Sequence, residues 1–136
     1  MKVDVIIPTY KPGKEFEELI CRLQKQTYSI HRIIIINTQT GVFPTELESE
    51  PYQIEIMHIR PEDFDHGGTR NMGASISHAD IVLYMTQDAV PADEHLIEKF
   101  ANVFEKHPEI GIAYGRQLPR EDCNIIERYT RRFNYP

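Results

Sequence analysis

The sequence predicts an α/β protein with a three-layer α/β/α architecture and a mostly parallel, Rossmann-like sheet. Short apolar, β-branched runs alternate along the chain with segments whose apolar residues recur at helical spacing. Two of the runs, Arg32–Ile36 and Ile81–Thr86, are continuously apolar over most of their length, which indicates strands buried on both faces. Strands that alternate with helices favour a parallel sheet with right-handed crossovers.

Each element follows from a local pattern. The expected strands are Val3–Ile7, which should stop at Pro8, then Arg32–Ile36, the weaker Gln53–Ile59, Ile81–Thr86 and the short Gly111–Tyr114. The expected helices are one with Phe16, Leu19, Ile20 and Leu23 on its apolar face, a short one over Thr69–Ser77, one whose stripe runs from Leu96 to Phe104, and a last one over Asn124–Arg132. Asp93 is the expected N-cap of the third helix.

Composition limits the classes of function that the chain can have. A length of 136 residues predicts one domain, and 40% hydrophobic with 26% charged residues is typical of a globular protein. A net charge of -6 disfavours nucleic acid as a partner, because phosphate contacts need clustered Lys and Arg. Cys21 and Cys123 form no disulfide framework, so we expect reduced thiols and a cytoplasmic setting. The longest apolar runs are too short for a transmembrane segment.

Ligands of parallel sheets bind beyond the carboxyl ends of the strands, so the residues that follow each strand are the first candidates. After the first strand, Pro8, Thr9 and Tyr10 stand where a dinucleotide-binding fold would have a glycine-rich turn. The Tyr10 ring can stack on a nucleobase and the Thr9 hydroxyl can bond to the edge of the base. The competing interpretation is a rigid turn bounded by prolines.

The second and third strands end in further polar groups. Asn37 and Thr38 suit a base or a ribose, although such residues are typical of any loop. Further on, Gly67 and Gly68 precede the short helix and Arg70 lies within it. Paired glycines allow a ligand close to the backbone, a helix N-terminus attracts anions, and the guanidinium fork matches a phosphate. The alternative for the glycines is a tight loop.

The fourth strand is followed by Thr86, Gln87 and Asp88. A carboxylate that leaves a buried strand is costly unless it is paired or binds a metal. Asp88 offers the oxygen ligand that Mg²⁺ or Mn²⁺ prefers, with substrate phosphates filling other positions. A capping role is the alternative, and Asp93 competes for it. His58, His78, His95 and His107 show no metal-ligand spacing.

These pieces, in this order, resemble the family 2 glycosyltransferases of the GT-A fold. Val5–Tyr10 is similar to the opening strand and nucleotide-binding turn of that family, Arg70–Gly73 to its Arg-Asn segment, and Thr86–Asp88 to its Asp-x-Asp motif. Phe64–Gly73 and Thr86–Ala89, with Gly115–Pro119 and Phe133–Pro136, look most similar to the rhamnosyltransferase branch. The resemblance covers essentially the whole chain.

The resemblance implies a nucleotide-diphosphate-sugar donor, a divalent metal (Mg²⁺ or Mn²⁺) and a saccharide or lipid-linked acceptor. It assigns the donor to Pro8, Thr9, Tyr10, Asn37, Thr38, Arg70, Gln87 and Asp88, with Asp88 also holding the metal. Two residues depart from the family pattern. Asn37 stands where a carboxylate is usual, and Thr86 replaces the first Asp of the metal motif.

The resemblance also bears on length. In this family the general base and the acceptor-binding elements follow the region represented here, so we expect residues 1–136 to be the nucleotide-sugar-binding N-terminal part of a glycosyltransferase domain. The expected fold is therefore an incomplete sheet of the nucleotide-diphospho-sugar transferase type. The catalytic base is expected beyond Pro136, and the isolated chain is expected to be inactive.

The function expected of the full-length enzyme is sugar transfer, with rhamnose as one candidate sugar, to an acceptor hydroxyl in cell-surface polysaccharide synthesis. The resemblance suggests inversion at the anomeric carbon. The alternatives are a nucleotidyltransferase of related architecture, a non-catalytic nucleotide-binding module and a purely structural domain. An unfinished sheet leaves an edge that a second copy can pair with, so a homodimer stays open. Attachment to the inner face of a membrane also stays open.

Overall fold

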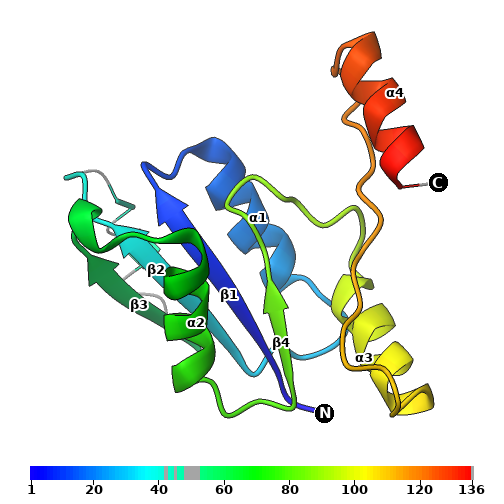
Figure 1. The fold of residues 1–136 in the computed structure, drawn as a ribbon, viewed down its shortest axis with the longest axis horizontal. Coiled ribbons are helices and arrows are strands. Elements are labelled where there is room, and N and C mark those ends of the chain that lie inside the picture. Colours follow the sequence, from blue (N-terminus) through cyan, green and yellow to red (C-terminus); the bar gives the residue numbers. More distant parts are fainter. Residues whose placement is uncertain (42, 45, 48–52, 136) are drawn as a thin grey trace. The chain divides into compact units, whose positions relative to one another are not determined.

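A computed structural model describes residues 1–41, 43–44, 46–47 and 53–135. It divides into two compact units, Met1–Lys106 and His107–Pro136, which we describe separately. The first unit contains the sheet and is drawn from blue to yellow in Figure 1. The second contains one helix and the segments that flank it.

The first unit is built on a four-stranded parallel sheet. Its strands are β1 (Val3–Tyr10), β2 (Arg32–Thr38), β3 (Ile54–Ile59) and β4 (Ile81–Tyr84). The strand order is β3-β2-β1-β4, and all three pairings are parallel. The predicted parallel sheet is confirmed. The order reverses between β1 and β4, so the topological switch point lies where these two strands end.

Helices cover both faces of the sheet, which confirms the three layers. The helices of this unit are α1 (Lys14–Gln24), α2 (His66–Ile76) and α3 (Leu96–Lys106), and Figure 1 shows α2 alone across the near face of the sheet. The larger core joins α1 and α3 to one face, with the fully buried Phe16 and Ile97 packed against odd-numbered residues of β1. The smaller core joins α2 to the other face through Ile6, Ile34 and Ile36.

Gly73 determines how closely α2 approaches the sheet. A Cβ atom at Gly73 would lie 2.7 Å from Ile6 Cγ2 and 3.1 Å from Ile36 Cδ1, so only glycine fits without displacement of the strands or the helix. This close approach brings the helix onto β1 and β2. It thereby fixes the height of the Arg70 backbone above the sheet.

The first strand is longer than the sequence suggests. It does not stop at Pro8 but continues to Tyr10, with Pro8 in register with Ile36 of β2. The carbonyls of Lys2 and Ile6 accept hydrogen bonds from the β4 side, so alternate residues of β1, Pro8 among them, turn their backbone toward β4. Because β4 pairs with β1 only as far as Ile6, the N–H that proline lacks costs no ladder bond.

The second helix begins earlier than expected. The prediction placed Gly67 and Gly68 in a loop before a helix at Thr69, but α2 starts at His66 and includes both glycines in its first turn. Asp65 is the N-cap, and its carboxylate accepts a hydrogen bond from the Gly68 N–H. This cap compensates for the low helix propensity of the two glycines.

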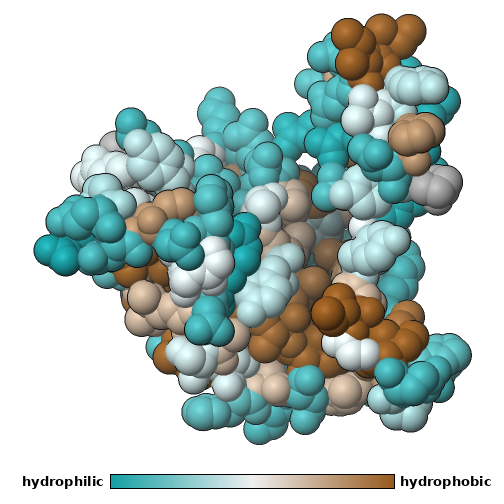
Figure 2. Space-filling model, viewed as in Figure 1, coloured by the Kyte–Doolittle hydropathy of each residue, from teal (hydrophilic) through white to brown (hydrophobic). Residues whose placement is uncertain are grey.

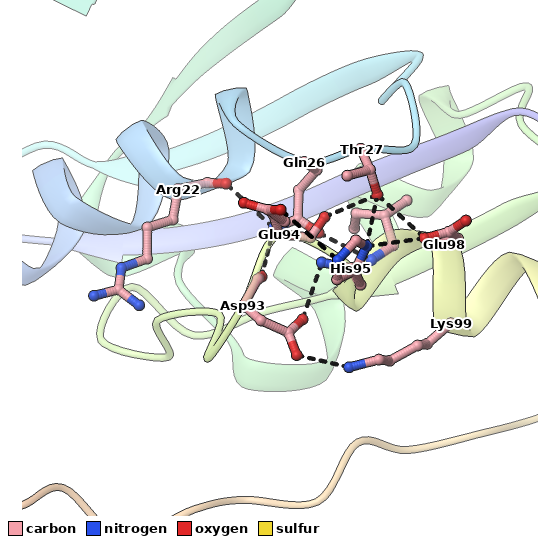
Figure 3. A network of polar contacts seen from close by, with 9 residues as sticks. Arg22, Gln26, Thr27, Asp93, Glu94, His95, Glu98 and Lys99 are labelled. Atoms are coloured by element: carbon pink, nitrogen blue, oxygen red, sulfur yellow. Dashed lines mark hydrogen bonds and ion pairs between the residues drawn. The ribbon is translucent and has the colours of Figure 1, made fainter.

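The turn that leads into α3 corrects the assignment of Asp93 (Figure 3). The helix starts at Leu96, so Asp93 lies too early to be its N-cap. Its carboxylate accepts hydrogen bonds from the His95 N–H at 2.9 Å and the Lys99 ammonium at 2.7 Å, which stabilises the preceding turn. The Ile97 N–H donates instead to Oε1 of Gln26, a residue that follows α1.

At the amino edge of the sheet, a buried carboxylate joins three elements. Asp4 of β1 is fully buried, and its oxygens lie 2.7 Å from His31 Nδ1, 3.2 Å from Arg32 Nη2 and 2.7 Å from the Ser77 hydroxyl. Arg32 also donates to Glu55 of β3. We call this group the Asp4 network. Burial acts to raise the pKa of Asp4, but the hydrogen bonds from Ser77, His31 and Arg32 outweigh it and hold that pKa below its ordinary value.

The second unit contains α4 (Ile125–Asn134), close to the expected helix. Asn124 is the N-cap, and its side-chain oxygen accepts a hydrogen bond from the Glu127 N–H at 2.8 Å. The expected strand Gly111–Tyr114 does not form, and its apolar residues are exposed to 88% (Ile112) and 83% (Tyr114). An apolar run becomes a strand only where a neighbour completes its hydrogen bonds, and the described part of this unit contains no strand.

Candidate functional site

The carboxyl edge of the sheet gathers most of the predicted site residues. Tyr10 ends β1, Thr38 ends β2, and Gln87 and Asp88 follow β4. The parallel pairing of β1 with both β2 and β4 brings Tyr10 and Asp88 to the same edge of the sheet, as the strand-end rule predicts. Tyr10 lies beside the switch point and is 54% exposed as a residue, so one face of its ring is available to a flat ligand.

Gln87 fixes the backbone of Tyr10. Its side-chain Oε1 accepts a hydrogen bond from the Tyr10 N–H at 2.8 Å, and its Nε2 donates to the Tyr10 carbonyl at 3.0 Å. The side-chain amide therefore replaces one residue of β4 beyond the point where that strand ends. This pairing uses both polar atoms of Gln87, so its contribution to a ligand site is to position Tyr10.

The turn after β1 has an unusual backbone. Lys11 has a φ of 47°, in the left-handed region that few residues other than glycine and asparagine adopt. Its ammonium lies 5.3 Å from the centre of the Tyr10 ring, in a cation–π contact. A positive charge is thus held at the switch point, next to the exposed ring. Sequence analysis did not single out Lys11, although its position after a strand end was the available signal.

A row of polar side chains crosses three strands at this edge. The Thr9 hydroxyl donates to Asn37 Oδ1 at 3.0 Å, and Asn37 Nδ2 lies 3.1 Å from His58 Nδ1. Thr9 and Asn37 are buried, whereas His58 is exposed and meets Phe43 edge-on at 5.4 Å between ring centroids. His58 is a second residue, after Lys11, that sequence analysis did not assign to this site. The strand-end rule, applied to β3 as it was to β1 and β2, would have indicated it.

Two buried hydroxyls near the same edge lack partners. Thr38 is 3% exposed, and its Oγ1 makes no hydrogen bond within the described residues; the same is true of Thr40 Oγ1. Buried polar groups are nearly always bonded, so an unpaired one needs an explanation. A bound ligand or water that supplies the missing partner is one such explanation.

Arg70 approaches the site from α2. The chain enters α2 from the carboxyl end of β3, so the first turns of the helix lie toward the site (Figure 1). The Arg70 guanidinium donates from Nη1 to the His66 carbonyl at 2.8 Å, and its other donors make no hydrogen bond to the residues that the structure describes. The Asp65 carboxylate that caps the helix places a negative charge at its N-terminus. This charge offsets the attraction of the helix dipole for an anion, so Arg70 rather than the dipole would attract one here.

Asp88 is the one expected metal ligand, and it is exposed beyond the end of β4. Among the residues that the structure describes, no group of three His, Cys, Asp or Glu side chains is arranged to hold a metal ion. Mg²⁺ is commonly held by one or two carboxylates together with substrate phosphates. Asp88 therefore fits a divalent ion only as part of a larger shell that includes a bound ligand.

The fold and the edge just described define a GT-A-type α/β domain with its polar residues collected at a switch point. A family model described as Glycosyl transferase family 2 matches residues 4–136. The chain therefore belongs to glycosyl transferase family 2, as its motifs predicted.

Two curated relatives cover nearly all of this chain. The O-antigen chain rhamnosyltransferase RfbN of Salmonella typhimurium (strain LT2) is 36% identical over 136 residues, which are 99% of this chain and 43% of that protein. The O-antigen chain rhamnosyltransferase WbaN of Salmonella anatum is 35% identical over 133 residues, 96% of this chain and 42% of that protein. The chain thus spans less than half the length of the curated relatives it matches. Similarity to the rhamnosyltransferase branch, expected from the motifs, is confirmed.

Solved structures support the fold. Residues 1–349 of S. aureus TarS superpose with a TM-score of 0.69 at 18% identity, over 88% of this chain and 39% of that one. The same protein in complex with UDP-GlcNAc gives 0.66 at 18% identity, over 88% and 37%. Its complex with UDP gives 0.67 at 18% identity, over 88% and 38%. At this identity the likeness concerns the fold alone.

The structure also bears on the expectations about membrane-spanning segments and about the two cysteines. None of the helices in the described part of the chain has the length and apolar character needed to cross a bilayer. Cys21 and Cys123 are both free thiols.

Proposed function

We propose that this chain is the donor-binding part of a glycosyltransferase that moves a sugar from a nucleoside diphosphate to an acceptor hydroxyl. Family membership and the two rhamnosyltransferase relatives support this proposal, with rhamnose as the candidate sugar and O-antigen-type polysaccharide as the product. The UDP and UDP-GlcNAc complexes of TarS support a nucleotide-sugar donor. A saccharide or lipid-linked acceptor at the cytoplasmic face of a membrane fits such a product.

The observation that carries the proposal is the exposed Tyr10 ring, held by Gln87 at the switch point beside buried polar groups. A nucleobase stacked on Tyr10 would lie over the end of β1. Thr9 and Asn37 would present polar atoms to the base or ribose, and the unpaired Thr38 hydroxyl offers one more bond. Pro8 contributes by keeping the end of β1 straight and in register with β2.

The charges suit a diphosphate. Arg70 provides a planar guanidinium and Lys11 a second cation near the Tyr10 ring, so negative charge can be met from two elements. Asp88 would hold Mg²⁺ or Mn²⁺ together with the phosphate oxygens of the donor. Such an ion would stabilise the negative charge of the leaving diphosphate.

The proposed reaction is direct displacement at the anomeric carbon with inversion. The acceptor oxygen forms a bond to the anomeric carbon, the bond to the diphosphate breaks, and a base takes the acceptor proton. We assign the role of that base to none of the described residues at the carboxyl edge of the sheet. We propose that it belongs to a part of the enzyme outside these 136 residues, so the isolated chain should bind donor without transferring sugar.

Calorimetry with a panel of nucleoside diphosphates, with and without Mn²⁺, tests the donor site. Arg70→Ala should weaken binding by about 1.5–3 kcal/mol, the value of a hydrogen bond to a charged group. Asp88→Asn should remove the gain in affinity that Mn²⁺ gives. Asp80→Asn, which changes an exposed carboxylate at the opposite edge of the sheet, is the matched control and should keep that gain.

The alternatives predict other results. Failure of every nucleoside diphosphate to bind would favour a structural domain. Binding of nucleoside diphosphates that Arg70→Ala leaves unchanged would assign Arg70 another task. Sugar transfer by the isolated chain would contradict the placement of the base, and Asp63, Asp65 and His66 would then be the residues to substitute.

A further inference from the structure

The pairing of β1 with the chain of β4 is interrupted at the switch point, and one side chain resumes it. In the described structure, the backbone hydrogen bonds between the two chains reach as far as the Met85 N–H and the Ile6 carbonyl, at 3.0 Å. The next residue of β1 that turns its backbone toward β4 is Pro8, which has no N–H to donate. Two residues further on, the side-chain amide of Gln87 bonds to both the N–H and the carbonyl of Tyr10.

The bond to the Tyr10 carbonyl also acts on the turn that follows β1. This carbonyl belongs to the peptide group that joins Tyr10 to Lys11, whose backbone is left-handed with a φ of 47°. A donor held 3.0 Å from the carbonyl oxygen limits the rotation of that peptide plane. The Lys11 ammonium lies 5.3 Å from the centre of the Tyr10 ring. Gln87 therefore orients both the ring and the cation, which form the nucleobase side of the proposed donor site.

Gln87 lies in the same turn as the proposed metal ligand. Gln87 and Asp88 are the two central residues of a turn over residues 86–89, which is closed by a hydrogen bond from the Ala89 N–H to the Thr86 carbonyl at 3.0 Å. A short turn closed in this way moves as a unit, so a displacement of Gln87 displaces Asp88 as well. The amide that holds Tyr10 thus connects the nucleobase side of the site to its metal side.

We propose that Gln87 is a positioning residue that couples the two sides, so that a divalent cation at Asp88 and a nucleobase on Tyr10 strengthen each other's binding. The inference rests on the proposed donor site. With Asp88 and phosphate oxygens joined to one ion, the 86–89 turn has less freedom, and the Gln87 amide extends that restriction to the Tyr10 backbone. Less entropy is then lost when a base stacks on the ring. Such a coupling is reciprocal, so the base should raise the affinity for the cation by the same factor.

Two simpler roles for Gln87 give different expectations. If its amide were a ligand of the ion or of the phosphates, its loss would weaken every phosphate ligand, with or without a base. If it only stabilised the fold, its loss would lower affinity in the same proportion with and without the ion. Inorganic pyrophosphate separates these cases, because it provides the phosphates without a nucleobase.

Calorimetry with and without Mn²⁺ measures the coupling, using pyrophosphate and the nucleoside diphosphate that binds most tightly in the panel. In the wild type, Mn²⁺ should raise the affinity for the nucleotide about fivefold more than the affinity for pyrophosphate, a factor at the lower end of couplings between sites. Gln87→Ala should remove this excess and leave the gain for pyrophosphate unchanged. Gln87→Asn, whose amide is one methylene group shorter, should do the same. Gln24→Ala, an exposed glutamine at the end of α1, is the matched control and should keep the excess.

The Tyr10 amide reports the connection by NMR without any base. The first unit carries mainly hydrophilic side chains toward the carboxyl ends of β1 and β4 (Figure 2), so water can reach the Tyr10 N–H once its partner is removed. Hydrogen exchange of that amide should be about fivefold faster in Gln87→Ala, the loss of one neutral hydrogen bond expressed as a ratio of rates. Mg²⁺ with pyrophosphate should shift the Tyr10 amide resonance in the wild type and in Gln24→Ala, but not in Gln87→Ala. Circular dichroism verifies that each variant is folded.

Three results would overturn the proposal while the proposed function stands. They are equal Mn²⁺ gains for nucleotide and pyrophosphate in the wild type, an excess that survives both substitutions of Gln87, and loss of the pyrophosphate gain in these variants, which would make Gln87 a direct ligand. A wild type that binds no nucleoside diphosphate would contradict the proposed function and this inference with it. The wild-type measurements need no substitution, so they test the coupling even where a variant fails to fold.

Discussion

The amino edge of the sheet and its carboxyl edge are built from the same strands, but the buried side-chain oxygens of Asp4 and Thr38 at these two edges differ in whether they are bonded. At the amino edge, both oxygens of Asp4 are bonded, to His31, Arg32 and Ser77, although the Nε atom of Arg32 has no hydrogen-bond partner among the described residues. At the carboxyl edge, the buried hydroxyl of Thr38 has no partner among the described residues, and the Tyr10 ring beside it is half exposed. Bonded polar groups stabilise the fold, whereas unpaired ones at a strand end are available to a ligand.

The same strands can stabilise the fold at one edge and bind a ligand at the other, because the two ends of strands of this length are about 20 Å apart. Successive side chains also point to opposite faces of the sheet. A substitution at the amino edge should therefore change the free energy of unfolding. One at the carboxyl edge should change nucleotide affinity. The following predictions test this division, beginning with the largest effect.

Loss of the Asp4 carboxylate should be the most destabilising change. Asp4→Ala removes the acceptor of three side chains and leaves the partly buried Arg32 with Glu55 as its ion-pair partner. We expect a loss of about 3 kcal/mol, as when one member of a buried ion pair is removed. Urea denaturation measures it, and Asp122→Ala, which removes an exposed carboxylate of the second unit, should stay within about 0.5 kcal/mol of wild type.

The Asp4 network also predicts how stability depends on pH. The folded-state pKa of Asp4 lies below its ordinary value of 3.8, so the network stabilises the protein fully above that pH and loses its contribution as the pH falls through the folded-state pKa. The unfolding free energy should thus fall in acid. In Asp4→Asn the fall should be shallower, with the remainder due to exposed carboxylates such as Asp63 and Asp93, whose pKa values are also lowered. Equal acid slopes in the two proteins would contradict this account.

Gly73 links the two edges, because it lets α2 lie close to the sheet while Arg70 reaches toward the site. Gly73→Ala places a methyl group 2.7 Å from Ile6, and overpacking of this kind costs about 1–3 kcal/mol. The better helix propensity of alanine returns at most about 1 kcal/mol. We expect lower stability and also weaker nucleoside diphosphate binding. Gly111→Ala, where nothing lies within 4 Å of the added carbon, is the control and should affect neither.

Local patterns predicted the sheet and most helices because they encode what buries each element. The apolar run of β2 and the stripe of α3 reflect contacts that any parallel α/β fold must make. Non-local conditions caused the errors. Pro8 stays in β1 because β4 pairs with β1 only as far as Ile6, and Gly111–Tyr114 forms no strand because no strand among the described residues pairs with it.

The candidate site was predictable to a similar degree. The strand-end rule located Tyr10, Asn37 and Asp88 without any structure. It did not indicate that the side-chain amide of Gln87 would form hydrogen bonds with the Tyr10 backbone. That contact depends on β4, which ends two residues before the expected boundary. His58 was overlooked because histidines were examined for metal spacing rather than for position after a strand.

Removal of the Tyr10 ring should weaken nucleotide binding and change stability little, which is the reverse of what we expect for Asp4→Ala. Stacking of a base on an aromatic side chain contributes about 1–3 kcal/mol, so Tyr10→Ala should weaken nucleoside diphosphate binding by that amount. The ring is half exposed, so stability should change by about 0.5 kcal/mol or less. Tyr114→Ala, an exposed tyrosine of the second unit, is the control. Unchanged affinity in calorimetry would remove Tyr10 from the site.

The smallest effect, and the sharpest test of the comparison, is expected at Thr38. Thr38→Val replaces a buried hydroxyl that has no partner in the described structure with a methyl group of similar size. Because an unpaired buried hydroxyl is unfavourable, the unfolding free energy should rise by up to about 1 kcal/mol. If the ligand is the missing partner, the same variant should bind nucleoside diphosphates more weakly by a similar amount. A stabilised protein with weaker binding would show that the carboxyl edge keeps a polar group for its ligand at the expense of the fold. A destabilised one would show that Thr38 is bonded in the folded protein, and the contrast with Asp4 would not hold there.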